Sequence, residues 1–195
     1  GFNQADEMVM SFVRWVMVRK RDEAAPAPKT VVPELDKAVS ASDLSVPDGL
    51  SFAEYNTDLA GSSYLYDDYT VGEVIDHIDG VTLSEAEHMM ATRLWQNTAK
   101  VHFDASVRPD GARLIYGGHV ISMARALSFN GLGNLQMLAA INGVAHANPC
   151  FAGDTLRAWS EVLDKAETSI PSVGALRLRL VAHKGSTPNL RGEDG

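Results

Sequence analysis

Cysteine and long apolar runs are scarce in this sequence, and each shortage excludes a class of structure. Cys150 is the single cysteine, so no disulfide can form within the chain, as suits a reducing compartment. No apolar run approaches the ~20 residues that a membrane-spanning helix needs, and the first residues lack the pattern of a secretory signal. The sequence therefore predicts a cytoplasmic protein that does not cross a membrane.

Basic residues are in the minority, which bears on the class of partner. The chain has 17 Lys and Arg against 25 Asp and Glu, a formal net charge of -8. Nucleic-acid binding needs a basic face, so this balance argues against a nucleic-acid partner. The sequence also lacks a His-Glu-x-x-His motif and a pair of cysteines, so we expect no metal site.

The hydrophobic pattern divides the chain into three parts. Residues 8 to 19 are apolar on both faces of an extended chain, which predicts a strand buried on two sides within a sheet. Residues 23 to 69 begin with an Ala- and Pro-rich linker and continue as a polar, irregular segment. Residues 70 to 195 carry the patterns of a compact domain. Both ends of the sequence look cut.

The domain should contain two helices. The first is expected to begin at Thr82, where two capping boxes overlap, and to end near Asn97. Its apolar positions at helical spacing are Ala86, Met89, Met90 and Leu94. The second should start after Gly117 and Gly118 and run to about Phe129. It is apolar almost all round, as is typical of a helix wrapped by other structure.

Strands are expected before and after these helices. Residues 70 to 78 suit a strand or an extended approach, and residues 137 to 146 and 155 to 163 suit strands. The clearest pattern is at residues 175 to 183, where leucines alternate with arginines. One buried helix followed by consecutive antiparallel strands predicts an α+β fold with a sheet curled around the helix.

Three motifs carry a resemblance to a known family. Residues 97 to 104 (NTAKVHFD) resemble the Asp-x-Asn-Pro-x-His motif of the MaoC-like R-specific enoyl-CoA hydratases. Residues 114 to 119 (LIYGGH) resemble the start of the family's central helix, and residues 148 to 156 (NPCFAGDTL) resemble its Pro-Val-x-x-Gly-Asp-x-Leu strand opening. The resemblance covers roughly residues 70 to 184 and implies a hot-dog fold.

Longer stretches such as TLSEAEHMMATRLWQNTAKVHFDA narrow the resemblance to members with two fused hot-dog halves. It implies that residues 1 to 22 are the last strand of a preceding half. Residues 70 to 195 would then be a second half that lacks its final strand. The implied activity is reversible hydration of a branched C5 dicarboxylic enoyl-CoA by a homo-oligomer, a dimer. Coenzyme A would be part of the substrate, and no other cofactor is expected.

Hydration of an unsaturated thioester needs a base for water, a proton for the α-carbon and donors for the thioester oxygen. The resemblance makes His102 the base; a histidine satisfied by structural hydrogen bonds is the alternative. Asn97 stands where the motif has its catalytic Asp, and an amide does not titrate. Asn97 could orient water or substrate, or simply end the helix. Asp104 could orient the imidazole or close a turn.

Gly117 and Gly118 lie where the apolar helix should begin. Free backbone N–H groups and the helix dipole suit an oxygen that gains negative charge, and the resemblance makes Gly118 the donor. Close packing at a helix start is the alternative for a glycine pair. His119 is a further candidate to face the substrate. Lys100 is a candidate for the CoA phosphates, with a solvated charge as its alternative.

Three functions therefore compete. A hydratase is favoured by His102 and by the glycine pair. A non-catalytic half that completes the fold and binds part of CoA is favoured by Asn97 in place of Asp. A hot-dog thioesterase, which would hydrolyse the acyl-CoA, is the third.

Overall fold

The computed structural model describes residues 1–16 and 18–185, and the chain divides into two compact units, Gly1–Leu35 and Asp36–Gly195. The predicted absence of a final strand concerns residues after Lys184, most of which lie outside the described residues. The predicted boundaries at residues 22 and 69, which refer to a longer protein, stay predictions.

The first unit does not form the strand expected at residues 8 to 19. Its described residues contain one isolated bridge, between Phe2 and Met8, and the apolar side chains that follow are exposed. A strand needs a neighbour to accept its backbone hydrogen bonds, and within the described residues of this unit only Met8, Val9 and Met10 find one, at Gly1 and Phe2. No strand is assigned in the described residues 8–16 and 18–19, and the last strand of a preceding half at residues 1 to 22 stays a prediction.

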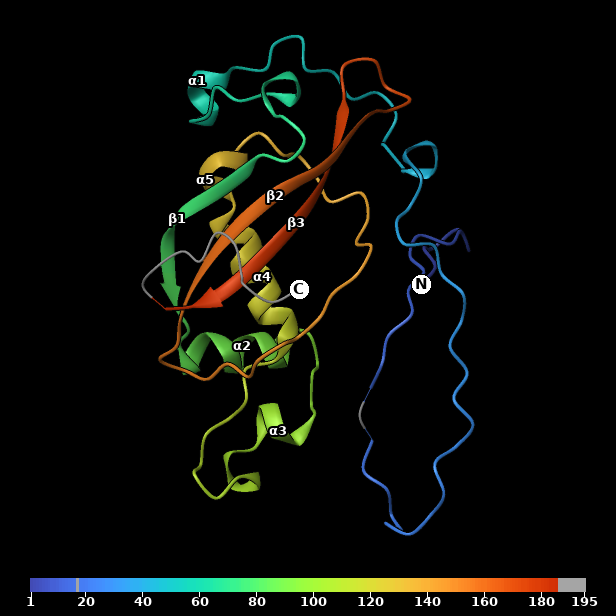
Figure 1. Ribbon diagram of the computed structural model, residues 1–195, viewed down its shortest axis with the longest axis vertical. Helices are drawn as coiled ribbons and strands as arrows, with labels where there is room; N and C mark the ends of the chain where they lie inside the picture. Colours follow the sequence, from blue (N-terminus) through green and yellow to red (C-terminus); the bar gives the residue numbers. More distant parts are fainter. Residues whose placement is uncertain (17, 186–195) are drawn as a thin grey trace. The chain divides into compact units, whose positions relative to one another are not determined.

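The second unit is built on a three-stranded antiparallel sheet in the order β1-β2-β3 (Figure 1). The strands are β1 (Val74–Thr82), β2 (Thr155–Glu167) and β3 (Gly174–Lys184). The strands predicted at 155 to 163 and 175 to 183 are confirmed. In β3 the leucines are half-buried and the alternating arginines are exposed, because only one face of this strand meets the core.

The strand expected at residues 137 to 146 is not formed. Residues 135 to 149 have an irregular backbone, and the apolar side chains of this stretch are exposed, among them Met137, Leu138, Ile141 and Val144. Periodicity alone does not make a strand: a neighbouring edge must accept its hydrogen bonds, and none of the described strands pairs with this stretch.

The helices of the second unit are mostly short. The longest are α2 (Glu85–Leu94) and α4 (Gly117–Leu127). The others are α1 (Thr57–Ala60), α3 (Lys100–Phe103), α5 (Phe129–Leu132) and the 3₁₀ turns η1 (Ala41–Asp43), η2 (Tyr66–Asp68) and η3 (Ala105–Val107). Helix α4 contacts all three strands of the sheet (Figure 1), as the sequence predicted for an apolar helix.

Helix α2 differs from the expected helix in its start and in its buried face. Thr82 ends β1, and Ser84 caps the helix by accepting from the Glu87 backbone amide at 3.2 Å. The buried residues are His88, Ala91 and Thr92, whereas Met90 and Leu94 are exposed. The apolar spacing predicted the wrong buried face because the side of this helix that meets the core carries small and polar side chains.

Two groups of buried side chains hold the second unit together. One contains Leu83, Ile115, Cys150 and Leu156, which come from the segments before α2, α4 and β2 and from β2 itself. The other joins the sheet to α5 and contains Tyr69, Leu132 and Val162. The first group fixes the residues that precede α2, α4 and β2, so it sets the frame in which these elements start.

A buried histidine ties β1 to the rest of the sheet. The His77 Nδ1 atom lies 2.7 Å from the Asn130 carbonyl oxygen, and its Nε2 atom lies 2.8 Å from the Ser160 hydroxyl. A carbonyl oxygen only accepts, so Nδ1 donates and Nε2 accepts from the hydroxyl. Burial lowers the pKa of His77, which favours this neutral, fully paired imidazole.

Leu156→Ala should lower the free energy of unfolding of the full-length protein by about 2–5 kcal/mol, because Leu156 is 1% exposed and its removal leaves a cavity. Urea unfolding measures the change. Glu167→Ala, at the exposed end of the same strand, is the matched control and should cost less than about 0.5 kcal/mol. Equal losses in the two variants would show that Leu156 is not part of the core.

Candidate functional site

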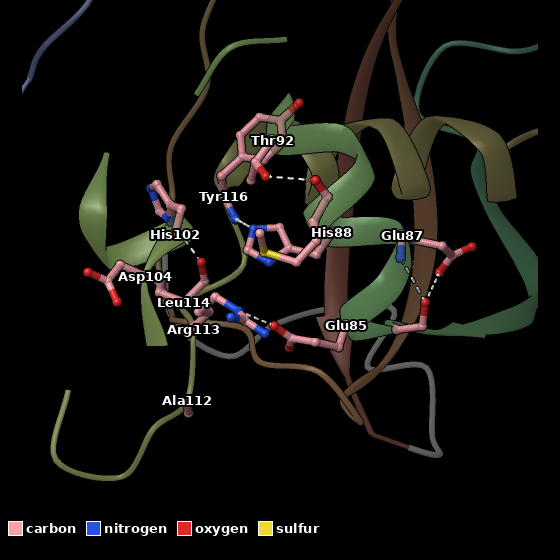
Figure 2. Close-up of polar contacts among 12 residues, drawn as sticks. Glu85, Glu87, His88, Thr92, His102, Asp104, Ala112, Arg113, Leu114 and Tyr116 are labelled. Carbon is pink, nitrogen blue, oxygen red and sulfur yellow. Dashed lines mark hydrogen bonds and ion pairs between the residues drawn. The ribbon is translucent and has the colours of Figure 1, made fainter. Parts of the chain in front are cut away.

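His102 lies in α3, and its ring is fixed by the segment that leads into α4. The His102 Nδ1 atom lies 2.7 Å from the Leu114 carbonyl oxygen, and the Leu114 amide donates to the Val101 carbonyl at 3.0 Å (Figure 2). The Val101 backbone and the His102 side chain of α3 thus both form hydrogen bonds with Leu114. The imidazole is half-buried, so one edge is held by protein while part of the ring remains accessible.

This contact fixes the tautomer of His102. Because a carbonyl oxygen has no proton to give, Nδ1 must donate, and in the neutral imidazole Nε2 then carries the lone pair. A histidine oriented through Nδ1 by a backbone carbonyl is a common arrangement for a ring that works through Nε2. The geometry therefore suits a base that removes a proton from water.

His88 is the most deeply buried histidine of this region. It lies on α2 with 0% exposure, and its Nε2 atom accepts a hydrogen bond from the Tyr116 backbone amide at 3.1 Å. Tyr116 is the N-cap residue of α4, so this bond connects α2 directly to the start of the central helix (Figure 2). The sequence analysis did not select His88 or Tyr116.

Four aromatic rings form a cluster around this point. The His88 ring centroid lies 6.4 Å from that of His102, 6.2 Å from Tyr116 and 6.2 Å from His119. The Tyr116 ring also lies 6.3 Å from His102 and 6.4 Å from His119. Three histidines from α2, α3 and α4 therefore meet at one place.

The glycine pair lies against two of the site's rings. A Cβ atom on Gly118 would come within 2.3 Å of the Tyr116 ring, and one on Gly117 would come within 2.1 Å of the His146 ring. Both positions therefore require glycine as the structure stands. Among the described residues, no side chain caps α4, so its first backbone N–H groups remain free to bind an oxygen that carries negative charge.

Among the described residues, the hydrogen bonds of Asn97 and Asp104 go to partners other than the His102 ring. Asn97 precedes α3 and accepts from the Ala99 amide at 3.4 Å. Asp104 caps η3, since its Oδ1 atom accepts from the amide and the hydroxyl of Ser106 at 2.9 and 2.7 Å. These bonds lower the pKa of Asp104, and the side chain is exposed. Lys100 is also exposed on α3.

An ion pair connects the outer edges of the site. The Arg113 guanidinium binds the Glu85 carboxylate, and Arg113 is the residue before Leu114, which holds His102 (Figure 2). This pair gives Arg113, one of the cations of the motif region, a local partner. Arg125 inside α4 has one as well, because it donates to the Ser128 hydroxyl at 2.8 Å.

Burial makes two histidines of the cluster resist protonation. It lowers the pKa of His88, and the neighbouring Glu85 carboxylate opposes this while His102, His119 and Arg113 add to it. Burial also lowers the pKa of His119, with Glu87 opposing. Desolvation disfavours the charged form of an imidazole, so these two rings are neutral near pH 7.

Two absences can be stated for the described part of the chain. No helix there is long and apolar enough to cross a membrane. Within residues 1–16 and 18–185, no group of three or more His, Cys, Asp or Glu side chains is arranged to hold a metal ion, although three histidines meet near α4. The expected lack of a metal site stays a prediction.

Sequence reasoning missed His88, Tyr116 and His146. One signal for His88 was present: it shares the spacing of Ala91 and Thr92, so a helix that buries those residues must bury His88 too. His146 gave no such signal, because it lies in an irregular segment that only the fold brings against Gly117.

The chain is similar in sequence and in fold to known proteins. A solved MaoC domain protein dehydratase from Chloroflexus aurantiacus matches with a TM-score of 0.79 and 58% identity, covering 88% of this chain and 50% of that one. Mesaconyl-CoA hydratase from Cereibacter sphaeroides is 70% identical over 197 residues, which cover 100% of this chain and 57% of the relative. The chain is thus similar over most or all of its length to a MaoC domain protein and to mesaconyl-CoA hydratase. A scan against models of protein families finds no match.

Two further comparisons bear on fold and length. β-Methylmalyl-CoA dehydratase from Chloroflexus aurantiacus is 60% identical over 190 residues, which cover 94% of this chain and 53% of the relative. A Mycobacterium tuberculosis protein with a double hot-dog fold matches with a TM-score of 0.53 and 24% identity, over 78% of this chain and 44% of that one. The predicted hot-dog fold is confirmed. The chain spans about half the length of the curated relatives it matches.

Because His88 and His119 are buried, the free energy of unfolding should fall as the pH is lowered. The unfolded chain binds protons at these histidines below about pH 6.5, whereas the folded site resists them. Their contribution is therefore complete above that pH and is lost as the pH falls towards the lowered pKa values of His88 and His119. His119→Gln should flatten the fall in the free energy of unfolding between about pH 7.5 and 5.5.

Urea unfolding at a series of pH values measures this slope. Ser122→Ala, on the exposed face of the same helix, is the matched control and should shift the whole curve without changing its slope. An unchanged slope in His119→Gln would show that the pKa of His119 is the same in the folded and the unfolded protein.

Proposed function

We propose that the protein hydrates an enoyl-CoA reversibly, as a hydro-lyase, with His102 as the base. The observation that carries this proposal is the bond from His102 Nδ1 to the Leu114 carbonyl, which leaves the Nε2 lone pair for water. The bond holds the ring close to the glycine-led start of α4, because Leu114 lies three residues before Gly117. The short segment that orients the base thus leads directly into the oxyanion donors.

The reaction balances with the groups present. Nε2 of His102 takes one proton from water while the oxygen adds to the β-carbon of the enoyl group. The double-bond electrons move towards the thioester oxygen, where the free N–H groups of Gly117 and Gly118 stabilise the negative charge. The imidazolium of His102 then gives this proton to the α-carbon, so the ring returns to its neutral form and both parts of the water molecule are in the product. No cofactor besides the CoA of the substrate is required.

The names of the relatives support mesaconyl-CoA as the substrate and β-methylmalyl-CoA as the product. Mesaconyl-CoA is an unsaturated thioester with a free carboxylate, so the site needs a donor or a cation for that group. His119 and Lys100 stay candidates for contacts with the substrate. Lys100 is exposed on α3, two residues before His102, where a phosphate or carboxylate can reach it.

The second candidate is a half that supports an active site elsewhere in a longer protein. Asn97 in place of Asp favours it, and so does the capping role of Asp104, since among the described residues neither supplies a carboxylate to His102. We place it second because the Leu114 carbonyl orients His102 without a carboxylate. The thioesterase stays a third prediction without a structural observation in its favour.

The cytoplasmic location and the homo-oligomeric, dimeric state also stay proposals. Exposed large apolar side chains on and after α2, among them Met90, Leu94 and Trp95, support an assembly in which they are covered.

His102→Ala should lower the turnover of mesaconyl-CoA in the full-length protein by ~10²–10⁴-fold, the usual contribution of a general base. Loss of the conjugated double bond and release of free thiol are followed in the same sample. Loss of conjugation without thiol, abolished by the substitution, is the expected result.

The matched control is His183→Gln, a histidine on β3 outside the ring cluster, which should leave turnover unchanged within roughly threefold. Unchanged hydration in a folded His102→Ala protein would favour the supporting half instead. Thiol release by the wild-type protein would favour the thioesterase.

A further inference from the structure

The three residues before the glycine pair are each held by a hydrogen bond from another element. The Leu114 carbonyl binds His102 Nδ1 at 2.7 Å, the Ile115 amide donates to the Cys150 carbonyl at 2.9 Å, and the Tyr116 amide donates to His88 Nε2 at 3.1 Å. Two of these three partners are histidine side chains. The last, His88, acts on the residue directly before Gly117.

The bond to Tyr116 requires a neutral His88. A backbone N–H can only donate, so Nε2 must accept and Nδ1 must carry the proton. If Nε2 were protonated, two N–H groups would face each other and the bond would be lost. The charged and titratable groups around the ring are Glu85 on the same helix, Arg113, His102 on α3 and His119 on α4.

His88 is costly as a mere core residue. Its Nδ1 atom is buried and has no hydrogen-bond partner among the described residues. An unsatisfied buried donor destabilises the fold, and an apolar side chain of similar size would avoid that cost. The property that an apolar residue cannot supply is the Nε2 acceptor for Tyr116.

We propose that His88 is a positioning residue of the hydratase, which holds the glycine-led start of α4 in place through the Tyr116 amide. This inference rests on the proposed function, because it assigns a purpose to the N–H groups of Gly117 and Gly118. His88 acts through Tyr116 and does not touch the substrate. Protonation of His88 breaks the bond, and the site then loses its oxyanion donors in acid.

Two substitutions in the full-length protein separate the acceptor from the volume of the side chain. His88→Gln keeps an oxygen close to the Nε2 position, whereas His88→Met fills similar space without a comparable acceptor. Met should lower kcat by ~10²-fold with little change in KM, because a displaced donor weakens the transition state more than the bound substrate. Gln should retain most of kcat at neutral pH.

The pH profile gives a readout that a purely structural role would not move. In the wild-type protein, protonation of His88 contributes to the loss of activity in acid. The slope of log kcat/KM against pH on the acid side should therefore be smaller by one in His88→Gln, which has no imidazole to protonate at this position. His183→Gln, outside the ring cluster, should keep the wild-type profile. An unchanged acid limb in His88→Gln, or equal losses of kcat in the Gln and Met variants, would overturn the proposal.

Hydrogen exchange of the peptide that spans residues 114 to 120 tests positioning without any substrate. Exchange should become faster in His88→Met and stay near the wild-type rate in His88→Gln. Equal exchange in all three proteins would also overturn the proposal. A wild-type protein that does not hydrate mesaconyl-CoA would contradict the proposed function, and the exchange experiment would still decide whether His88 positions this segment.

Discussion

The hydrogen bonds of the Leu114–Tyr116 segment are the constraint on which the site depends. This segment receives His102 from α3 and His88 from α2, and it continues directly into the glycine pair of α4. A shift of the segment would therefore move the base and the oxyanion donors together. The Ile115 side chain, 3% exposed, anchors the same segment in the core, so packing and polar contacts act on the same three residues.

The sheet also holds the Leu114–Tyr116 segment in place, through apolar contacts. Leu156 of β2 belongs to the buried group that contains Ile115 and Leu83, and Leu83 immediately precedes the cap of α2. The starts of α2 and α4 are thus fixed by the same apolar contacts, which is why a histidine on α2 can reach the residue that caps α4. Burial at this junction also keeps His88 neutral, since desolvation disfavours the charged imidazole.

Much of the fold could be predicted from local sequence signals. The alternation in β3, the start of α4 at the glycine pair and the α+β class all depend on short-range patterns, and the structure contains them. The strands expected at 8 to 19 and 137 to 146 depend instead on a pairing partner, and periodicity carries no information about partners. The buried face of α2 was missed because its inward residues serve polar contacts as well as packing.

The site could be predicted only in part, for the same reason. His102 and the glycine pair were found through motifs, but the bond between His88 and Tyr116 joins residues 28 positions apart. The central claim is that His102 and the start of α4 face the reacting atoms of one enoyl-CoA. A crystal structure of the full-length protein with the hydrated product tests this most directly. The account predicts the new hydroxyl at His102 Nε2 and the thioester oxygen at the Gly118 amide, and product bound away from both would contradict it.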